Sequence, residues 1–271
     1  MSAFDRRLAA SALLALCACA PSVQQEVQMG NDYAAQIAQQ MPLINDAGIN
    51  SLFAQTVNPL RRVAQRQDLA WDFHIVNSDQ VNAFAVPGGH VYVFEGLLAK
   101  SETPDELAGV IAHEMGHVVH RDGTRAVLQS AGLSFLFGMT LGDFVGGGAV
   151  VIAAKTVLSS SYSRHAEAAA DRYSVELMQK VEADPKALAA ILSRIASDKD
   201  EGVALLRDHP ETKERIAAIN KVTVDDPPKP LLTGAEWKAL KAICGSSPGD
   251  GKGDNQLKSS NQPKPSGQPK P

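Results

Sequence analysis

The spacing of hydrophobic and polar residues divides the first part of the chain into a helical region followed by three short strands. Residues 32–66 place apolar side chains at helical spacing, which predicts helical structure. Residues 69–76 alternate between apolar and polar positions, as in a strand with one buried face. Two more strand-like runs, 81–86 and 90–94, are joined by a Pro-Gly-Gly turn signal. We therefore expect a small antiparallel sheet.

Helices dominate the remaining pattern. Thr103 is a favourable N-cap, Pro104 suits the first helical position, and Glu106 completes a capping box, so a helix is predicted over residues 104–121. Apolar periodicity predicts further helices at about 165–181, 185–195, 210–220 and 235–243. The predicted fold class is therefore α+β, mostly helical, with the helices packed beside the small sheet.

The N-terminus has the order of charged, apolar and small residues that is typical of a secretory signal. Arg6 and Arg7 precede an apolar stretch over residues 8–16, which is too short to span a membrane stably. Cys19 follows Ala18, an order that resembles the lipid-attachment site of bacterial lipoproteins. The alternative is that the cysteines in this region are merely small apolar residues of the signal.

These features predict four segments: a signal peptide (1–18), a polar tether beginning at the lipidated Cys19 (19–30), one large domain (31–245) and a tail (246–271). The tail consists largely of Gly, Pro, Ser, Lys and Gln, so it cannot bury a core and is expected to be disordered. Ala20 rather than Asp follows Cys19. By the resemblance to bacterial lipoproteins, this implies an outer-membrane lipoprotein that faces the periplasm and is held to the membrane by its lipid.

The overall charge argues against one class of partner. The formal net charge is −4 at pH 7 and the pI is about 6.0. Binding to nucleic acid needs a clustered basic surface, and no dense Lys/Arg patch precedes the C-terminal tail. We therefore expect no nucleic-acid partner.

The most informative motif is His113-Glu114-Met115-Gly116-His117, an HExxH sequence within the capped helix. Residues at i and i+4 share one helix face, with Cβ atoms about 5–6 Å apart. Two imidazoles placed in this way can bind one Zn²⁺. Glu114 points toward the neighbouring side and can serve as general base without being a ligand. The motif predicts one zinc ion per chain at this site.

A catalytic zinc needs a third protein ligand. Metzincins use a histidine six residues after the second one, but that position is Gly123. Glu167 and Asp171 are a better pair, because their i, i+4 spacing within an Ala-rich helix start lets one carboxylate bind the metal and the other hold a ligand histidine. The alternative is two solvated helix carboxylates.

The HEMGH motif, the SRxxExxxD segment about 50 residues later and the His-Pro pair at 209–210 with Arg215 together resemble the HtpX-like zinc metallopeptidases, in particular their bacterial lipoprotein and periplasmic members. The resemblance spans residues 32–220. It implies a zincin-like fold with Glu167 as third ligand, Asp171 holding a ligand histidine and Arg215 supporting the site. It also places His209 near the metal, either as an oxyanion donor or as an occupant of the open metal position. Asp122 departs from the Arg-His pair that many relatives carry there.

Together these features predict a zinc-dependent endopeptidase that acts on unfolded or misassembled envelope proteins in protein quality control. Glu114 would be the base, and His209, or else Tyr162, the oxyanion donor. A strand edge at 81–86 or 90–94 could bind extended substrate. The main alternative is an outer-membrane chaperone or assembly factor with a latent protease site, which would have outer-membrane assembly proteins as partners. A structural lipoprotein anchored by its tail would leave the motif unexplained.

The Gly-rich apolar stretch over residues 131–158 has three interpretations. Asp143 and Lys155 interrupt it, which argues against a clean transmembrane span of about 20 residues. A buried core helix is the second interpretation. We favour the third, a helical cover over the cleft that also contacts the membrane surface or a partner.

Overall fold

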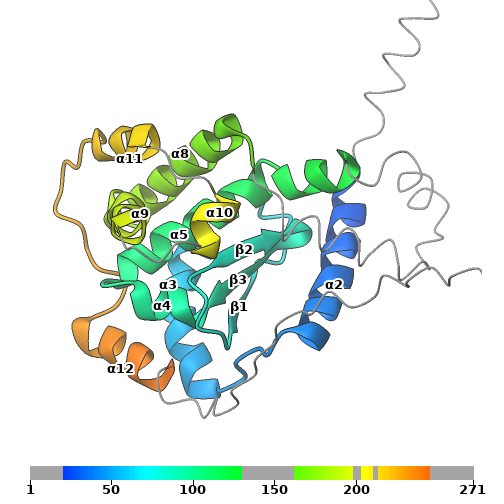
Figure 1. Cartoon of the computed structure of the whole chain (residues 1–271), viewed down its shortest axis with the longest axis horizontal. Helices are drawn as coiled ribbons and strands as arrows, with labels where there is room; N and C mark the ends of the chain where they lie inside the picture. Colours follow the sequence, from blue (N-terminus) through cyan, green and yellow to red (C-terminus); the bar gives the residue numbers. More distant parts are fainter. Residues whose placement is uncertain (1–20, 130–161, 198–202, 210–212, 245–271) are drawn as a thin grey trace, which may run out of the picture.

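The computed structural model describes residues 21–129, 162–197, 203–209 and 213–244. Helices surround a three-stranded sheet (Figure 1), which confirms the predicted α+β class. The named helices are α2 (Val23–Gln40), α3 (Ala47–Val63), α4 (Glu95–Lys100), α5 (Pro104–Val119), α8 (Arg164–Lys180), α9 (Ala187–Ser197), α10 (Ala204–Asp208), α11 (Lys213–Asn220) and α12 (Gly234–Cys244). The short helices α4 and α10 were not predicted from the sequence.

The sheet is mixed, so the prediction of a purely antiparallel sheet is wrong. Its strands are β1 (Asp72–Val76), β2 (Ala83–Val86) and β3 (His90–Phe94), in the order β1-β3-β2. β2 and β3 form an antiparallel hairpin, whereas β1 pairs with β3 in parallel. Strands β2 and β3 are both buried at every position. Strand β3 pairs on both sides and separates β1 from β2.

The hairpin turn depends on glycine. Gly88 and Gly89 follow Pro87 and have φ values of 87° and 99°. Residues with a Cβ rarely adopt this left-handed region. The predicted turn at 87–89 is therefore confirmed, as a 3-10 turn (η1, Pro87–Gly89).

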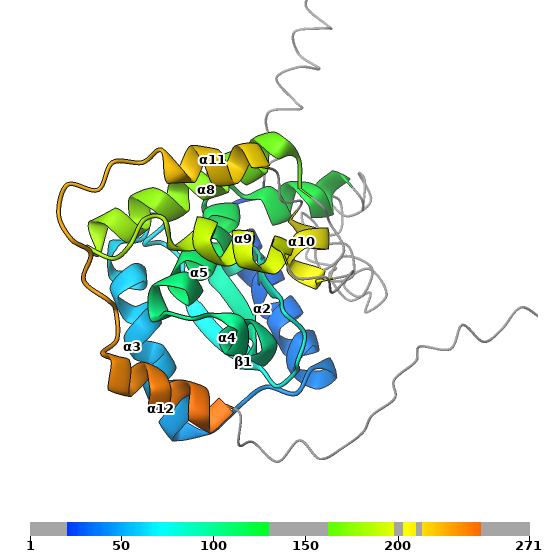
Figure 2. The same ribbon diagram turned by 60° about the vertical axis from the view of Figure 1, so that its left-hand side comes forward.

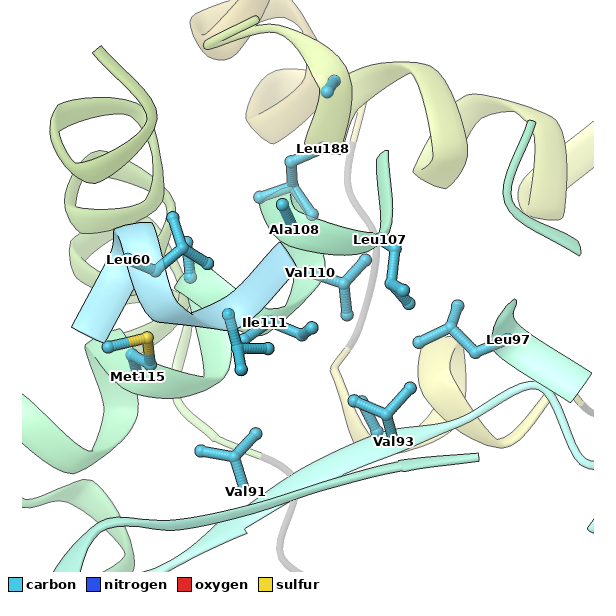
Figure 3. Close-up of a cluster of buried hydrophobic side chains, with 14 of the residues drawn as sticks. Leu60, Val91, Val93, Leu97, Leu107, Ala108, Val110, Ile111, Met115 and Leu188 are labelled. Carbon is cyan, nitrogen blue, oxygen red and sulfur yellow. The ribbon is translucent and has the colours of Figure 1, made fainter. Parts of the chain in front are cut away.

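Helix α5 lies in the centre of the main core. Its N-cap is Thr103, whose side chain accepts a hydrogen bond from the Glu106 amide, as predicted. The Glu106 carboxylate instead accepts from the Glu102 amide and pairs with Arg194. Figure 3 shows apolar side chains of α5 surrounded by those of α3, β3, α4 and α9: Leu107, Ala108, Val110, Ile111 and Met115 against Leu60, Val91, Val93, Leu97 and Leu188. This packing fixes the helix that carries the HExxH motif.

A second, smaller core lies on the other face of the sheet, under helix α2. Figures 1 and 2 show the sheet between α5 and α2. Residues 23–30, expected to belong to a polar tether, instead form the first turns of α2. A capping box of Ser22 and Gln25 begins the helix. Glu26, which looks polar and exposed in the sequence, is fully buried and paired with Arg66 and Arg121.

Several predictions concern residues outside the described ranges: lipidation at Cys19, the tail over 246–271, the segment 131–158 and the start of the helix predicted at 210. Within the described ranges, none of the helices has the length and apolar character needed to cross a membrane.

Candidate metal centre

The HExxH residues lie deep inside the protein because α8 packs closely against α5. Gly116 makes this approach possible, since a Cβ there would lie 2.9 Å from the Cα of Ala170. His113, Glu114 and His117 are 3%, 1% and 2% exposed. The contact between Gly116 and Ala170 also places Glu167, one helical turn before Ala170, beside the HExxH motif. Gly116, which directly precedes the second motif histidine, therefore has a structural role that its sequence position alone does not reveal.

Four side chains converge at one point. Nε2 of His113 lies 3.1 Å from Nε2 of His117. The two oxygens of Glu167 lie 3.4 Å from His113 Nε2 and 3.5 Å from His117 Nε2. His209 joins them, with its Nδ1 3.1 Å from Glu167 Oε1. Ligand atoms of all four lie within 4.8 Å of one another.

Carboxylates hold the outer nitrogens of both motif histidines. Nδ1 of His113 lies 3.0 Å from Asp171 Oδ1. Nδ1 of His117 lies 2.9 Å from Asp122 Oδ2. A carboxylate at Nδ1 favours the tautomer that leaves Nε2 unprotonated and directs it toward a metal.

Asp122 is a site residue that sequence reasoning missed. It lies just beyond α5, after His120 and Arg121, and Arg121 has a φ of 58°. This left-handed residue reverses the chain and returns Asp122 to His117. The available signal was an acidic residue five positions after the second motif histidine.

Arg215 of α11 joins the two carboxylates of α8. Its Nη1 lies 2.8 Å from Glu167 Oε2, while its Nε and Nη2 both lie 2.7 Å from Asp171 oxygens. The guanidinium is buried with them. Arg215 therefore orients both carboxylates and compensates part of their buried charge.

Glu114 and Tyr162 border the same point. Glu114 Oε1 lies 3.4 Å from Nε2 of His209. The Tyr162 ring stacks on His117, with ring centroids 4.1 Å apart. The structure thus brings together every site residue predicted from the sequence that lies in the described ranges.

The pKa shifts of the buried histidines and carboxylates are compatible with a site for a cation. Burial lowers the pKa of His117 to about 3, so this imidazole stays neutral. Burial opposes charge on His113 as well, but Asp171 and Glu167 outweigh it and raise the pKa of His113 to about 9. Despite burial, His113 and His209 hold the pKa of Glu167 well below its usual range. Burial raises the pKa of Glu114, as suits a proton acceptor.

The residues fit a zinc ion. Ligand atoms at about 2.0–2.1 Å from a tetrahedral Zn²⁺ lie about 3.3 Å apart, close to the 3.1, 3.4 and 3.5 Å observed among His113, His117 and Glu167. Two Nε2 atoms this close repel each other unless a proton or a cation lies between them. A divalent cation can replace the proton that the raised pKa of His113 would otherwise retain.

A family model described as "Peptidase family M48" matches residues 50–223. The match covers most of the chain and includes every side chain described at this centre. The chain belongs to peptidase family M48. The matched region of this M48 chain contains the complete HExxH site.

Curated relatives agree with this assignment. The chain is 31% identical over 214 residues to the Escherichia coli (strain K12) "Beta-barrel assembly-enhancing protease", covering 72% of this chain and 43% of that protein. A Yersinia pestis protein of the same name is 30% identical over 239 residues, 81% and 48% of the two chains. The Schizosaccharomyces pombe "Mitochondrial metalloendopeptidase OMA1" is 31% identical over 163 residues, 59% and 48%. The M48 chain therefore spans less than half the length of these relatives.

Proposed function

We propose that this M48 chain is a zinc-dependent endopeptidase that cleaves unfolded or unassembled proteins of the bacterial cell envelope. The observation that carries the proposal is the position of Glu114. Its carboxylate is buried beside the convergent imidazoles of His113 and His117 without joining the group of ligand atoms. A site that only stored zinc or held the fold together would have no use for such a base.

His113, His117 and Glu167 would hold the zinc. Bound there, zinc would supply Lewis acidity, which polarises the scissile carbonyl and makes a water molecule nucleophilic near neutral pH. Glu114 accepts the proton of the attacking water and passes it to the leaving amine. Asp171 and Asp122 keep the two imidazoles oriented throughout, and Arg215 keeps Glu167 and Asp171 in place.

An edge strand of the sheet supports a mode of substrate binding in which the enzyme recognises the main chain of the substrate rather than its side chains. β2 lies at an edge of the sheet, whereas β3 is central and paired on both sides. Of the two strands considered from the sequence, β3 is therefore excluded and β2 remains. Addition of an extended segment to β2 would use main-chain hydrogen bonds, so it suits an enzyme that cleaves unfolded segments of many sequences.

The names of two relatives and the N-terminal sequence support the proposed substrate class and cellular location. Two of the relatives above are named for assembly of β-barrels, which are proteins of the outer membrane. The N-terminal sequence order favours lipidation at Cys19. We infer an outer-membrane lipoprotein that faces the periplasm and acts in quality control of envelope proteins, with outer-membrane assembly proteins as partners.

The second candidate function is that of a chaperone or assembly factor whose protease site is latent. One observation favours it: Nδ1 of His209 lies 3.1 Å from Glu167 and 3.4 Å from Nε2 of His113. A histidine at these distances can take the ligand position that water and substrate need. Such a protein would bind unfolded clients without cleaving them.

A cleavage assay separates the two functions. The purified full chain is incubated with an unfolded outer-membrane β-barrel protein and with the same protein folded in detergent. The endopeptidase proposal expects fragments from the unfolded form only, loss of cleavage with a chelator, and recovery when zinc is restored. Binding of the unfolded form without fragments, at saturating zinc, would favour the chaperone.

A further inference from the structure

A second group of potential metal ligands lies on the face of the sheet that is opposite to α5. Side chains alternate along a strand, so Asp72 and His74 of β1 share one face. His90 of β3 is the register partner of Asp72 and lies on that same face. Tyr92 and Val76, their neighbours there, belong to the core under α2, whereas Val91 and Ile75 belong to the core around α5. The group is therefore separate from the metallopeptidase centre.

Three ligand atoms of this group converge. Oδ2 of Asp72 lies 3.0 Å from Nε2 of His74 and 3.7 Å from Nδ1 of His90. All three atoms lie within 4.8 Å of one another. These separations bracket the spacing of about 3.3 Å between ligands of a tetrahedral zinc ion with bonds of about 2.0–2.1 Å.

The outer nitrogen of His90 is held in the way that metal-binding histidines usually are. Its Nε2 lies 3.1 Å from the amide oxygen of Asn31 in α2. An amide oxygen only accepts, so the ring proton is on Nε2 and the Nδ1 lone pair faces Asp72 and His74. His90 is 9% exposed, and its Nδ1 has no hydrogen-bond partner among the described residues. A buried lone pair aimed at a carboxylate needs a proton or a cation between them. Asn31 holds the proton of the neutral His90 ring on Nε2, which leaves the cation.

The remaining surroundings also suit a bound ion. Nε2 of His74 likewise makes no aligned hydrogen bond within the described part of the chain, and its ring is fixed by stacking on Tyr92, with centroids 4.8 Å apart. The side chain of Asp72 is 54% exposed and that of His74 26%, so solvent ions can enter. His74 and then His90 hold the pKa of Asp72 well below its usual range, and its carboxylate stays ionised.

We propose that Asp72, His74 and His90 form a second zinc site, with water in the fourth position. Two imidazoles and one carboxylate favour Zn²⁺ over Mg²⁺ or Ca²⁺, which prefer oxygen ligands. The ion would join the edge strand β1 to β3 and, through Asn31, to α2. Its role would be to stabilise this side of the domain, and it is independent of the proposed peptidase activity.

The test counts zinc per chain in the purified full-length protein by elemental analysis after dialysis, with binding followed by calorimetry. The wild type should hold about two zinc ions. Asp72→Asn and His74→Gln should each hold one and keep cleaving unfolded substrate. His113→Ala should lose the other ion and keep this one. Asp72 is largely exposed, so its amide variant tests the site even if His90→Asn fails to fold.

Two further variants sharpen the result. Asn31→Ala should weaken the second zinc by about 10–100-fold, because it releases the ring of His90. His165→Gln removes an exposed histidine outside both groups and should change neither ion. In the His113→Ala background, zinc should raise Tm, and Asp72→Asn should abolish that rise. A single zinc in the wild type, or a second zinc that persists with unchanged affinity in both Asp72→Asn and His74→Gln, would overturn the proposal.

Discussion

Asp122 holds Nδ1 of His117 at 2.9 Å. The contact links the chain reversal at Arg121 directly to the proposed metal site, because the left-handed residue and the carboxylate that it returns are adjacent in sequence. The two motif histidines are thus held by different elements: His113 by Asp171 of α8, and His117 by the residue that begins the helical segment 122–129.

Asp122→Asn should weaken the catalytic zinc by about tenfold or more, since an amide no longer raises the basicity of His117. Competition with a chelator of known affinity measures the change. Asp105→Asn is a matched control, because Asp105 is also buried but accepts from the backbone amides of Asp184 and Leu231. Equal zinc affinity in Asp122→Asn and the wild type would mean that this contact does not tune the ligand.

His113→Ala, His117→Ala and Glu167→Ala should each lose the proposed catalytic zinc, because each removes one of three proposed ligands whose atoms lie 3.1–3.5 Å apart. Elemental analysis should show one zinc fewer per chain than in the wild type, with circular dichroism confirming that the helices remain. Undiminished zinc in Glu167→Ala would remove Glu167 from the ligand set.

His209 has two possible roles that predict opposite results. An oxyanion donor acts only in the transition state, so its loss would lower kcat by about 10²–10³-fold. An occupant of the open metal position competes with water and substrate, so its loss would raise the rate. The distance of 3.4 Å between His209 Nδ1 and His113 Nε2 favours the occupant, and we expect His209→Ala to cleave unfolded substrate faster.

The control for His209→Ala is His120→Ala, which removes a half-buried histidine that is not among the converging ligands. Its rate should equal that of the wild type. A large fall in the rate of His209→Ala at saturating zinc would assign His209 to the oxyanion instead.

Cys19→Ala should move the protein from the membrane fraction to the soluble periplasm, because lipid attachment is the proposed anchor. Cys17→Ala should change little, since Leu16 precedes that cysteine where the small residue is expected. Mass spectrometry of the mature N-terminus measures the modification directly. A diacylglycerol on Cys17 would contradict the assignment.

The sequence was most informative where one local pattern determines the outcome. The HExxH motif, its N-capped helix and the i, i+4 pair Glu167 and Asp171 each lie on a single helix, so spacing alone predicts which side chains share a face. These elements formed as predicted. The helical character of residues 164–180 and 187–197 also followed from apolar periodicity.

What the sequence did not reveal depends on contacts between distant residues. The parallel pairing of β1 with β3 joins two strands that are not consecutive in the chain, and the alternation of residues within each strand does not specify it. The burial of Glu26 depends on Arg66 and Arg121 reaching it, whereas the capping box of Ser22 and Gln25 that begins α2 is local and was overlooked. Asp122 became recognisable only because Arg121 reverses the chain.

The most direct test of the proposed peptidase mechanism is the variant Glu114→Gln. The amide keeps the size of the side chain and leaves His113, His117 and Glu167 in place, but it cannot accept the proton of the attacking water. With Glu114 as the base, we expect unchanged zinc content and a turnover of unfolded substrate lowered by at least about 10²–10⁴-fold. A variant with full zinc that cleaves at nearly the wild-type rate would contradict this mechanism.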